Sequence, residues 1–357
     1  MDTHATNAAT NAATNATAPA PATAVAIATM NAIRFHEYGE TADVLRMEQV
    51  PVPDPGPGRI RVAVHACGLN PADWALCSGL FPGRLPRGIG LDVSGTVDAV
   101  GDGVTGVAAG DRVLGRADYA GGHSAGAADF AIMDHWAHLP AGLDPVQAAA
   151  LPMAVETAYR SIEGLRVTAG QTLLVNGAGT TVGFAAVQIG LLRGARVFAS
   201  AGATYAQRLR ALGATVTAYG DGMAERVTAA AGGPVDLVLD TAPPCGALPA
   251  LVRITGGDPR RVLTVTDFAA ARELGVRTSF DGDQPAARRF DVLGDYARRA
   301  ADGRFTIPVA RTFPLDQWRA ALEISQSGQA RGKLVLLPGE ASADRPDSPS
   351  ATRPTGW

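Results

Sequence analysis

The chain is poor in cysteine, which excludes two classes of protein. Its three cysteines, Cys67, Cys77 and Cys245, are too few for a disulfide framework and match no CxxC metal spacing. Free thiols are typical of a reducing compartment, so we expect a cytoplasmic protein. Lysine is scarcer still, because Lys333 is the only one and all other basic residues apart from histidine are arginine.

The chain also lacks an excess of positive charge, an aromatic surface and a long apolar run. The formal net charge is -3 and aromatic residues make up 6%, so nothing indicates a nucleic-acid surface. No apolar run approaches the roughly 18 residues of a membrane helix. We therefore expect neither a nucleic-acid nor a membrane partner. Hydrophobic residues make up 46% of the 357 residues, which predicts a large core and about two domains.

The two ends of the sequence differ in composition from the rest. Residues 1–29 consist mainly of Ala, Thr, Asn and Pro, and residues 339–357 are rich in Pro, Gly, Ser and Asp. Neither stretch has enough apolar surface to offset the entropy lost on ordering. Both are predicted to be disordered tails around a folded part that covers residues 30–338.

The folded part contains two different patterns of predicted secondary structure. Up to residue 151 the signals are strands and turns, with predicted strands at 60–66, 94–100 and 111–115. From residue 152 to 283 strands alternate with helices, which predicts a parallel, doubly wound sheet. The predicted strands of this alternating segment are 172–176, 195–199, 235–239 and 261–265, and its clearest predicted helices are 182–192 and 205–212. The remaining 286–302 and 315–327 are predicted to be helical, and 333–336 is predicted to be a last strand.

A glycine-rich turn lies between the first strand and the first helix of this alternation. It reads Gly177-Ala178-Gly179-Thr180-Thr181-Val182-Gly183. In such a turn the glycines let the backbone approach a pyrophosphate, and the helix N-terminus supplies free N–H groups and positive potential. The sequence therefore predicts a dinucleotide site, whereas the simpler interpretation is a tight turn without a ligand.

The end of the next strand favours one dinucleotide over the other. Enzymes that use NAD place an acidic residue there to bind the ribose diol, but this chain reads Ala199-Ser200-Ala201-Gly202. Ser200 and Arg208 could bind a 2′-phosphate, and Tyr205 and Tyr219 follow within reach. These residues predict NADPH, although Arg208 could instead be a solvated helix residue and Tyr219 an aromatic residue at the core edge.

Eight segments, in order along the chain, resemble the medium-chain dehydrogenase/reductase superfamily. They point to its zinc-independent quinone oxidoreductase branch, which also contains enoyl reductases. The segments are Met30–Gly39, Asn70–Asp73, Gly90–Gly95, Gly110–Val113, Ala148–Pro152, Ala186–Gln188, Leu212–Ala214 and Arg331–Leu336.

The resemblance implies an architecture and a set of cofactor residues. It implies a GroES-like catalytic domain from residues 30–151 plus 284–338, a Rossmann domain from 152–283 inserted into it, and a homodimer. By matching motif, Thr157 would lie near the nicotinamide. The pyrophosphate would be bound by the turn that contains Gly177, Ala178 and Gly179 and ends at Val182. The nicotinamide ribose would be flanked by four further residues, namely Thr241, Ala242, Val265 and Thr266.

The sequence departs from its relatives at several positions. Thr180 and Thr181 stand where relatives usually have glycine, and their hydroxyls could donate to phosphate. Ala75 or Phe81 stands where many relatives have tyrosine, which leaves the proton donor open. Asn70 and Leu91-Asp92 stand where zinc-dependent relatives have metal ligands, and catalytic zinc needs three protein ligands, so no metal is expected.

These residues lead to one main hypothesis and two alternatives. The main hypothesis is an NADPH-dependent reductase that transfers hydride to a quinone or an α,β-unsaturated carbonyl, with Asn70 as the candidate catalytic residue. Asn70 could equally cap a turn. One alternative is a stand-alone enoyl reductase that tailors polyketides. The other is a non-catalytic NADPH-binding protein, such as a redox sensor or a structural protein.

Overall fold

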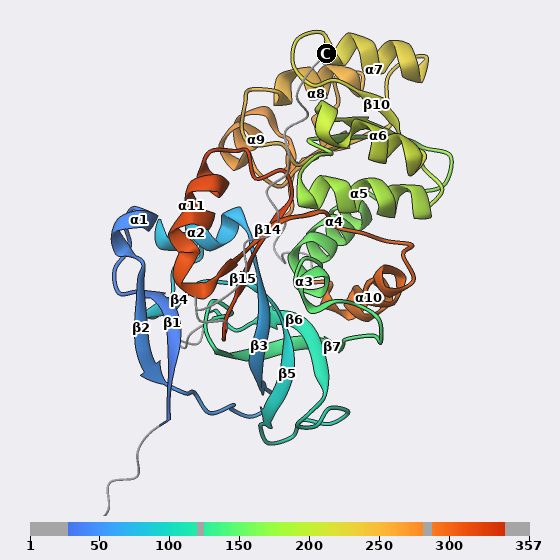
Figure 1. The fold of residues 1–357 in the computed structure, drawn as a ribbon. Helices are drawn as coiled ribbons and strands as arrows, with labels where there is room; N and C mark the ends of the chain where they lie inside the picture. The colour runs from blue at the N-terminus through green and yellow to red at the C-terminus, as the bar shows by residue number, and fades with distance from the viewer. Residues whose placement is uncertain (1–27, 120–124, 281–287, 340–357) are drawn as a thin grey trace, which may run out of the picture.

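A computed structural model describes residues 28–119, 125–280 and 288–339. These residues form a β-rich part and an α/β part, which lie at opposite ends of the molecule in Figure 1. The predicted tails lie almost wholly outside the described residues. The parallel, doubly wound sheet and the β-rich partner unit are both confirmed.

The β-rich part is built around a six-stranded sheet that contains both halves of the sequence. Its strand order is β14-β15-β3-β5-β6-β7, and β3 also pairs with β7. Strands β15 and β3 are antiparallel, with Leu336 opposite Cys67, so β15 near the end of the chain lies in the same sheet as β3. The strands are β3 (Ile60–Leu69), β5 (Asp92–Val100), β6 (Arg112–Ala117), β7 (Phe130–His138), β14 (Val309–Pro314) and β15 (Lys333–Leu337).

A small antiparallel sheet completes this part, in the order β2-β1-β4. Strand β1 (Thr29–Phe35) pairs with β2 (Arg46–Pro51) and with the short β4 (Arg87–Gly88). The first strand begins one residue before the predicted boundary at 30. Ala28 also belongs to this edge, because its carbonyl accepts a hydrogen bond of 2.9 Å from the N–H of Val52.

The α/β part contains a parallel six-stranded sheet in the order β10-β9-β8-β11-β12-β13. The order reverses direction between β8 and β11, and ligands of open parallel sheets bind at the carboxyl ends beside such a switch point. The strands are β8 (Thr172–Asn176), β9 (Arg196–Ser200), β10 (Thr215–Thr217), β11 (Leu237–Asp240), β12 (Val262–Thr264) and β13 (Arg277–Thr278). Strand β8 is buried throughout, which explains the apolar sequence between its terminal Thr172 and Asn176.

Helices pack on the parallel sheet and join it to the β-rich part (Figure 1). A single buried cluster contains Leu114 of the β-rich part together with residues of α4, α5 and β8, so the two parts share a core. The helices of the α/β part and its junction are α3 (Pro145–Ala148), α4 (Pro152–Gly164), α5 (Thr181–Leu192), α6 (Ala203–Ala211), α7 (Met223–Ala231), α8 (Leu248–Ile254), α9 (Phe268–Leu274) and α10 (Leu293–Ala301). The others are α1 (Thr41–Val44), α2 (Pro71–Cys77) and α11 (Trp318–Gln326). None of the helices within the described residues has the length and apolar character needed to cross a membrane.

Candidate active site

The glycine-rich turn connects β8 to α5 at the switch point of the parallel sheet. Thr180 is the N-cap of α5, and its hydroxyl accepts a hydrogen bond of 2.9 Å from the N–H of Gly183 and donates one of 3.1 Å to Oγ1 of Thr241. The Thr180 hydroxyl therefore stabilises the turn itself, and a contact between this hydroxyl and a phosphate remains a prediction. The backbone N–H groups of Thr181 and Val182 lie in the first helical turn, where a helix offers no intrahelical acceptors.

The three glycines of the turn have different surroundings. A Cβ atom added at Gly177 (φ 76°) would lie 2.5 Å from the backbone N of Ala242, and one added at Gly183 would lie 2.3 Å from the carbonyl oxygen of Gly177. Both glycines are thus required for close packing of the backbone. At Gly179 the nearest atom to an added Cβ is Cδ2 of Tyr205 at 3.4 Å. Gly179 therefore presents the open side of the turn, which suits the approach of a pyrophosphate.

Buried polar side chains connect the carboxyl ends of four neighbouring strands beneath this turn. The hydroxyl of Ser200 donates to Oδ1 of Asn176 (2.6 Å), and Nδ2 of Asn176 donates to Oδ1 of Asp240 (2.8 Å). The other carboxylate oxygen of Asp240 accepts from the hydroxyl of Thr264 (2.9 Å). Burial raises the pKa of the Asp240 carboxyl, against the hydrogen bonds from Asn176 and Thr264. Asn176 was not among the predicted site residues, although a polar residue that ends an apolar strand was a usable signal.

The residues predicted to flank the nicotinamide ribose lie together beside this network. The hydroxyl of Thr266 donates to the carbonyl of Ala242 (2.6 Å), and the N–H of Val265 donates to the carbonyl of Asp240 (3.0 Å). Thr241 is buried, and its hydroxyl lies 2.9 Å from the carbonyl of Asn176. Thr241 therefore stabilises the turn from its buried side. Ala242, Val265 and Thr266 are only partly buried.

The four residues predicted to recognise the 2′-phosphate lie at different depths. Ser200 is fully buried and accepts from the N–H of Gly177, so its hydroxyl shapes the turn, and contact with a 2′-phosphate remains a prediction. Tyr205 packs its ring on Phe184. Arg208 is exposed on α6. The exposed ring of Tyr219 lies against Gly202, where an added Cβ would be 3.2 Å from Cε1.

Arg331 joins this group from the far end of the sequence. The hydroxyl of Tyr205 donates to the carbonyl of Arg331. Burial raises the pKa of this hydroxyl, against the opposing charges of Arg208 and Arg331. Arg331 also has φ 48°, a left-handed conformation that is uncommon for residues other than glycine. The sequence resemblance covered this segment but gave Arg331 no role, because only the return of β15 brings it beside α6.

Asn70, the predicted catalytic residue, is the N-cap of α2 and belongs to a buried polar cluster. Its Oδ1 accepts from Nζ of Lys333 (2.6 Å), and its Nδ2 donates to Oδ2 of Asp92 (3.1 Å). Lys333 also forms an ion pair of 2.6 Å with Asp92, and both side chains are 1% exposed. The Asn70 amide is thus held by protein groups, and direct contact with a substrate remains a prediction.

The same cluster fixes the start of two helices. The carboxylate of Asp73 accepts from the backbone N–H groups of Asn70 (2.6 Å), Gly90 (2.7 Å) and Leu91 (2.9 Å). Burial raises the pKa of Asp73 to about 6, against the opposing effect of the Asn70 hydrogen bond. Asp92 accepts from the N–H of Met153 in the first turn of α4 (2.9 Å), and α4 carries Thr157.

Thr157 lies beside a buried ion pair on α4. Its hydroxyl lies 3.4 Å from Sδ of Met153 and 3.3 Å from Oε2 of Glu156. Glu156 pairs with Arg160 one turn later (Nε–Oε1 2.6 Å), and Arg160 also donates to the carbonyl of Ser279 (2.8 Å). These contacts fix the face of α4 on which Thr157 lies.

Comparisons with known proteins agree with this arrangement. Residues 56–141 match the family described as alcohol dehydrogenase GroES-like domain, and residues 212–336 match the one described as zinc-binding dehydrogenase. A quinone oxidoreductase structure from Coxiella burnetii superimposes with a TM-score of 0.72 at 27% identity, covering 87% of this chain and 99% of that one. The chain belongs to the medium-chain dehydrogenase/reductase superfamily.

Curated relatives of this superfamily match over different lengths. Human quinone oxidoreductase is 36% identical over 185 residues, which are 50% of this chain and 55% of the human protein. The phthioceranic/hydroxyphthioceranic acid synthase of Mycobacterium tuberculosis is 31% identical over 318 residues, which are 83% of this chain but 15% of that protein. The match thus spans about half of the human relative and a small part of the synthase. The superfamily is one of oxidoreductases that bind a nicotinamide cofactor.

One of the two matched families is described as zinc-binding, which makes the possible metal ligands of this chain relevant. Within the described ranges, no three or more His, Cys, Asp or Glu side chains gather as they would around a metal ion. Asn70 and Leu91, at the positions of the zinc ligands of relatives, are buried but unsuited to ligate zinc.

We expect turnover to survive dialysis against a strong chelator with less than about a twofold loss, because the residues that the structure describes offer no three-ligand site. The measurement is the steady-state rate before and after dialysis, with metal content determined on the same samples. Stoichiometric zinc in active protein, together with loss of rate on chelation, would contradict this expectation.

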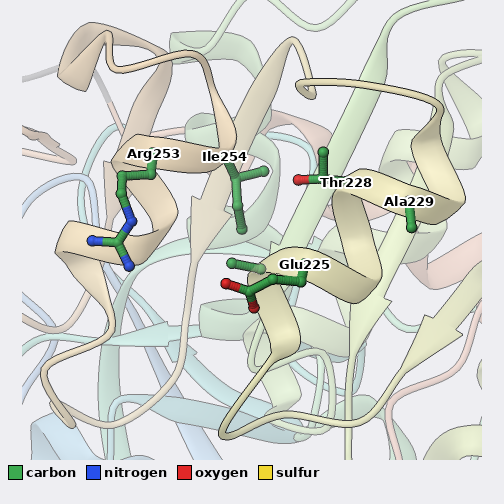
Figure 2. A pocket seen from close by; sticks show the side chains of 6 residues that line it. Glu225, Thr228, Ala229, Arg253 and Ile254 are labelled. Carbon is green, nitrogen blue, oxygen red and sulfur yellow. The ribbon is translucent and has the colours of Figure 1, made fainter.

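A hollow of about 450 Å³ lies between the outer helices α7 and α8. It is lined by residues of α7 and α8, among them Glu225, Thr228 and Arg253 (Figure 2). None of its lining residues belongs to the glycine turn or to the strand ends of this reductase-like fold. It plays no part in the proposed chemistry.

Proposed function

We propose that the protein is an NADPH-dependent reductase of electron-poor conjugated acceptors, namely quinones or α,β-unsaturated carbonyls. The observation that carries this proposal is the turn at the switch point, where Gly179 opens the start of α5 while Gly177 and Gly183 are closed by backbone contacts. The superfamily membership and the quinone oxidoreductase relatives support it. A cytoplasmic homodimer is part of the same proposal.

The residues present fit a dinucleotide. The N–H groups at the start of α5 would bind the pyrophosphate, and Ala242, Val265 and Thr266 would flank the nicotinamide ribose. The chemistry that NADPH supplies when bound is a hydride, which together with one proton from solvent converts a quinone to a hydroquinone or saturates an enone.

The protein's own contribution is position and electrostatics. Asp92 holds the first turn of α4 through the N–H of Met153, and this contact would help to orient Thr157 toward a bound nicotinamide. Backbone and hydroxyl donors near the strand ends would stabilise negative charge that develops on the acceptor oxygen. Asn70 is proposed to be one of these donors, with its amide held in place by the hydrogen bond from Lys333.

Cofactor preference gives a direct test. We expect NADPH to bind at least about tenfold tighter than NADH, since one charge-assisted contact to the 2′-phosphate is worth about 1.4 kcal/mol. Replacing Arg208 with Ala should remove most of that preference and leave NADH affinity within about twofold. The measurement is a fluorescence titration with both cofactors.

Arg210→Ala is the matched control, because Arg210 is exposed on the same helix but has no proposed cofactor contact. Equal affinity of the unmodified protein for both cofactors would contradict the preference. A loss in Arg210→Ala as large as that in Arg208→Ala would show a general charge effect of α6.

The experiment that tests the function follows NADPH absorbance with 1,4-quinones, straight-chain enones and enoyl thioesters side by side. Turnover of at least one class is expected. Cofactor binding without turnover of any acceptor would favour the non-catalytic alternative. A rate confined to enoyl thioesters would favour the polyketide-tailoring enoyl reductase.

A further inference from the structure

Three phenylalanine rings meet where the β-rich part contacts the α/β part. Phe81 follows α2 in the first, whereas Phe268 begins α9 and Phe280 follows β13 in the second. The ring centroid of Phe280 lies 5.6 Å from that of Phe81 and 5.6 Å from that of Phe268. We call these three residues the aromatic junction.

Phe81 is held in an unfavourable backbone conformation. Its φ of 52° is left-handed, a region that residues with a bulky side chain rarely adopt. Its carbonyl accepts a hydrogen bond of 2.7 Å from Arg87, which is 1% exposed and also donates to the carbonyl of Tyr119. Such strain persists only where the surroundings impose it, and it concentrates at functional sites. The side chain thus held is 37% exposed, although it is a large apolar group.

The aromatic junction adjoins both segments assigned to the nicotinamide end of the site. The guanidinium of Arg160 lies 5.8 Å from the ring centroid of Phe280, and Arg160 is one turn beyond Thr157 on α4. Phe268 follows Thr266 by two residues. The guanidinium of Arg288 also lies over Phe280, at 5.5 Å, and both arginines pair with Glu156. These cations help to fix the orientation of the Phe280 ring.

We propose that the aromatic junction is the wall against which a planar ring acceptor rests, so that the protein prefers quinones to open-chain enones. This inference rests on the proposed function and narrows its substrate class. Aromatic side chains favour edge-to-face and offset contacts with another flat π-system, whereas an alkyl enone gains only its buried area. Phe81 and Phe280 come from different parts of the fold and their rings meet edge to face, so an acceptor ring that rests on this surface would contact both.

The test compares Phe81→Leu, Phe280→Leu and Phe130→Leu. Leucine keeps apolar bulk but removes the ring, and Phe130 is a matched control on β7 outside the proposed site. Each variant is assayed with NADPH against 1,4-naphthoquinone and against a straight-chain alkyl enone, and its melting temperature is measured. In Phe81→Leu and Phe280→Leu we expect kcat/KM for the quinone to fall about tenfold, mainly through KM, with the enone within about twofold.

The outcomes separate this inference from the function on which it rests. Equal losses with both acceptors would mean that the rings only join the two parts, and no loss with either would place the wall elsewhere; both results overturn the inference. An unmodified protein that reduces the enone but not the quinone also overturns it and leaves the proposed function standing. An unmodified protein that reduces neither overturns both.

Discussion

Replacing Lys333 with Met should lower the free energy of unfolding by about 3–5 kcal/mol, since the Asp92 carboxylate would remain buried without its charged partner. Lys333 also donates to Asn70, so the substitution removes a second buried hydrogen bond. Methionine has a similar length and shape, and therefore the packing of the stem is largely kept. Urea unfolding followed by tryptophan fluorescence measures the loss.

The control for this prediction is the double variant Lys333→Met with Asp92→Asn. Removing the charge from Asp92 should recover a large part of the stability, because asparagine still has an oxygen that can accept from the N–H of Met153. A loss below about 1 kcal/mol in the single variant would show that water or local rearrangement compensates Asp92. Losses that simply add in the double variant would show that the two side chains are not coupled.

Replacing Gly177 with Ala should weaken NADPH binding more than about tenfold and destabilise the protein by about 2–4 kcal/mol. The added methyl group would lie 2.5 Å from the backbone N and 2.7 Å from the Cα of Ala242, neither of which is a flexible side-chain end. The turn and the end of β11 must therefore move apart. This movement shifts the N–H groups at the start of α5 away from the place where they would bind the pyrophosphate. Cofactor titration and thermal unfolding measure the two effects.

Gly170→Ala is the matched control for backbone strain. Gly170 has φ 82°, similar to the 76° of Gly177, but no atom lies within 4 Å of its added Cβ. The free energy of unfolding of Gly170→Ala should fall by only about 1–2 kcal/mol, which is the cost of a left-handed alanine. Its NADPH affinity should be unchanged. If both variants lose the same stability and the same affinity, contact with Ala242 is not what makes Gly177 necessary.

Local sequence signals located the elements of the α/β part well. Strand β8 was predicted with the bounds that the structure shows, and α5 begins one residue before its predicted start. The reason is that a buried parallel strand is continuously apolar and its helix follows a glycine turn, so both signals are contained in a few neighbouring residues. Strands such as β7, β10 and β13 were missed, because β10 and β13 have at most three residues and β7 mixes apolar and polar residues without strict alternation.

The sequence by itself determined the superfamily, the division into a β-rich and a Rossmann-like part, and the position of the glycine turn. Each depends on residue types at short spacing or on motifs in a fixed order. The tertiary structure decided what individual polar side chains do. Ser200 was predicted from its place at a strand end, but only the packing of β9 beside β8 brings its hydroxyl against Asn176.

The same holds for contacts between distant parts of the chain. Lys333 and Asn70 are 263 residues apart, and only the pairing of β15 with β3 brings them within 2.6 Å. The meeting of Phe81 with Phe280 likewise depends on how the two parts pack. Hydrogen bonds and ring contacts act over a few ångströms, whereas a sequence pattern reports burial and period. The sequence therefore singled out Asn70 and Phe81 but not the residues that they contact.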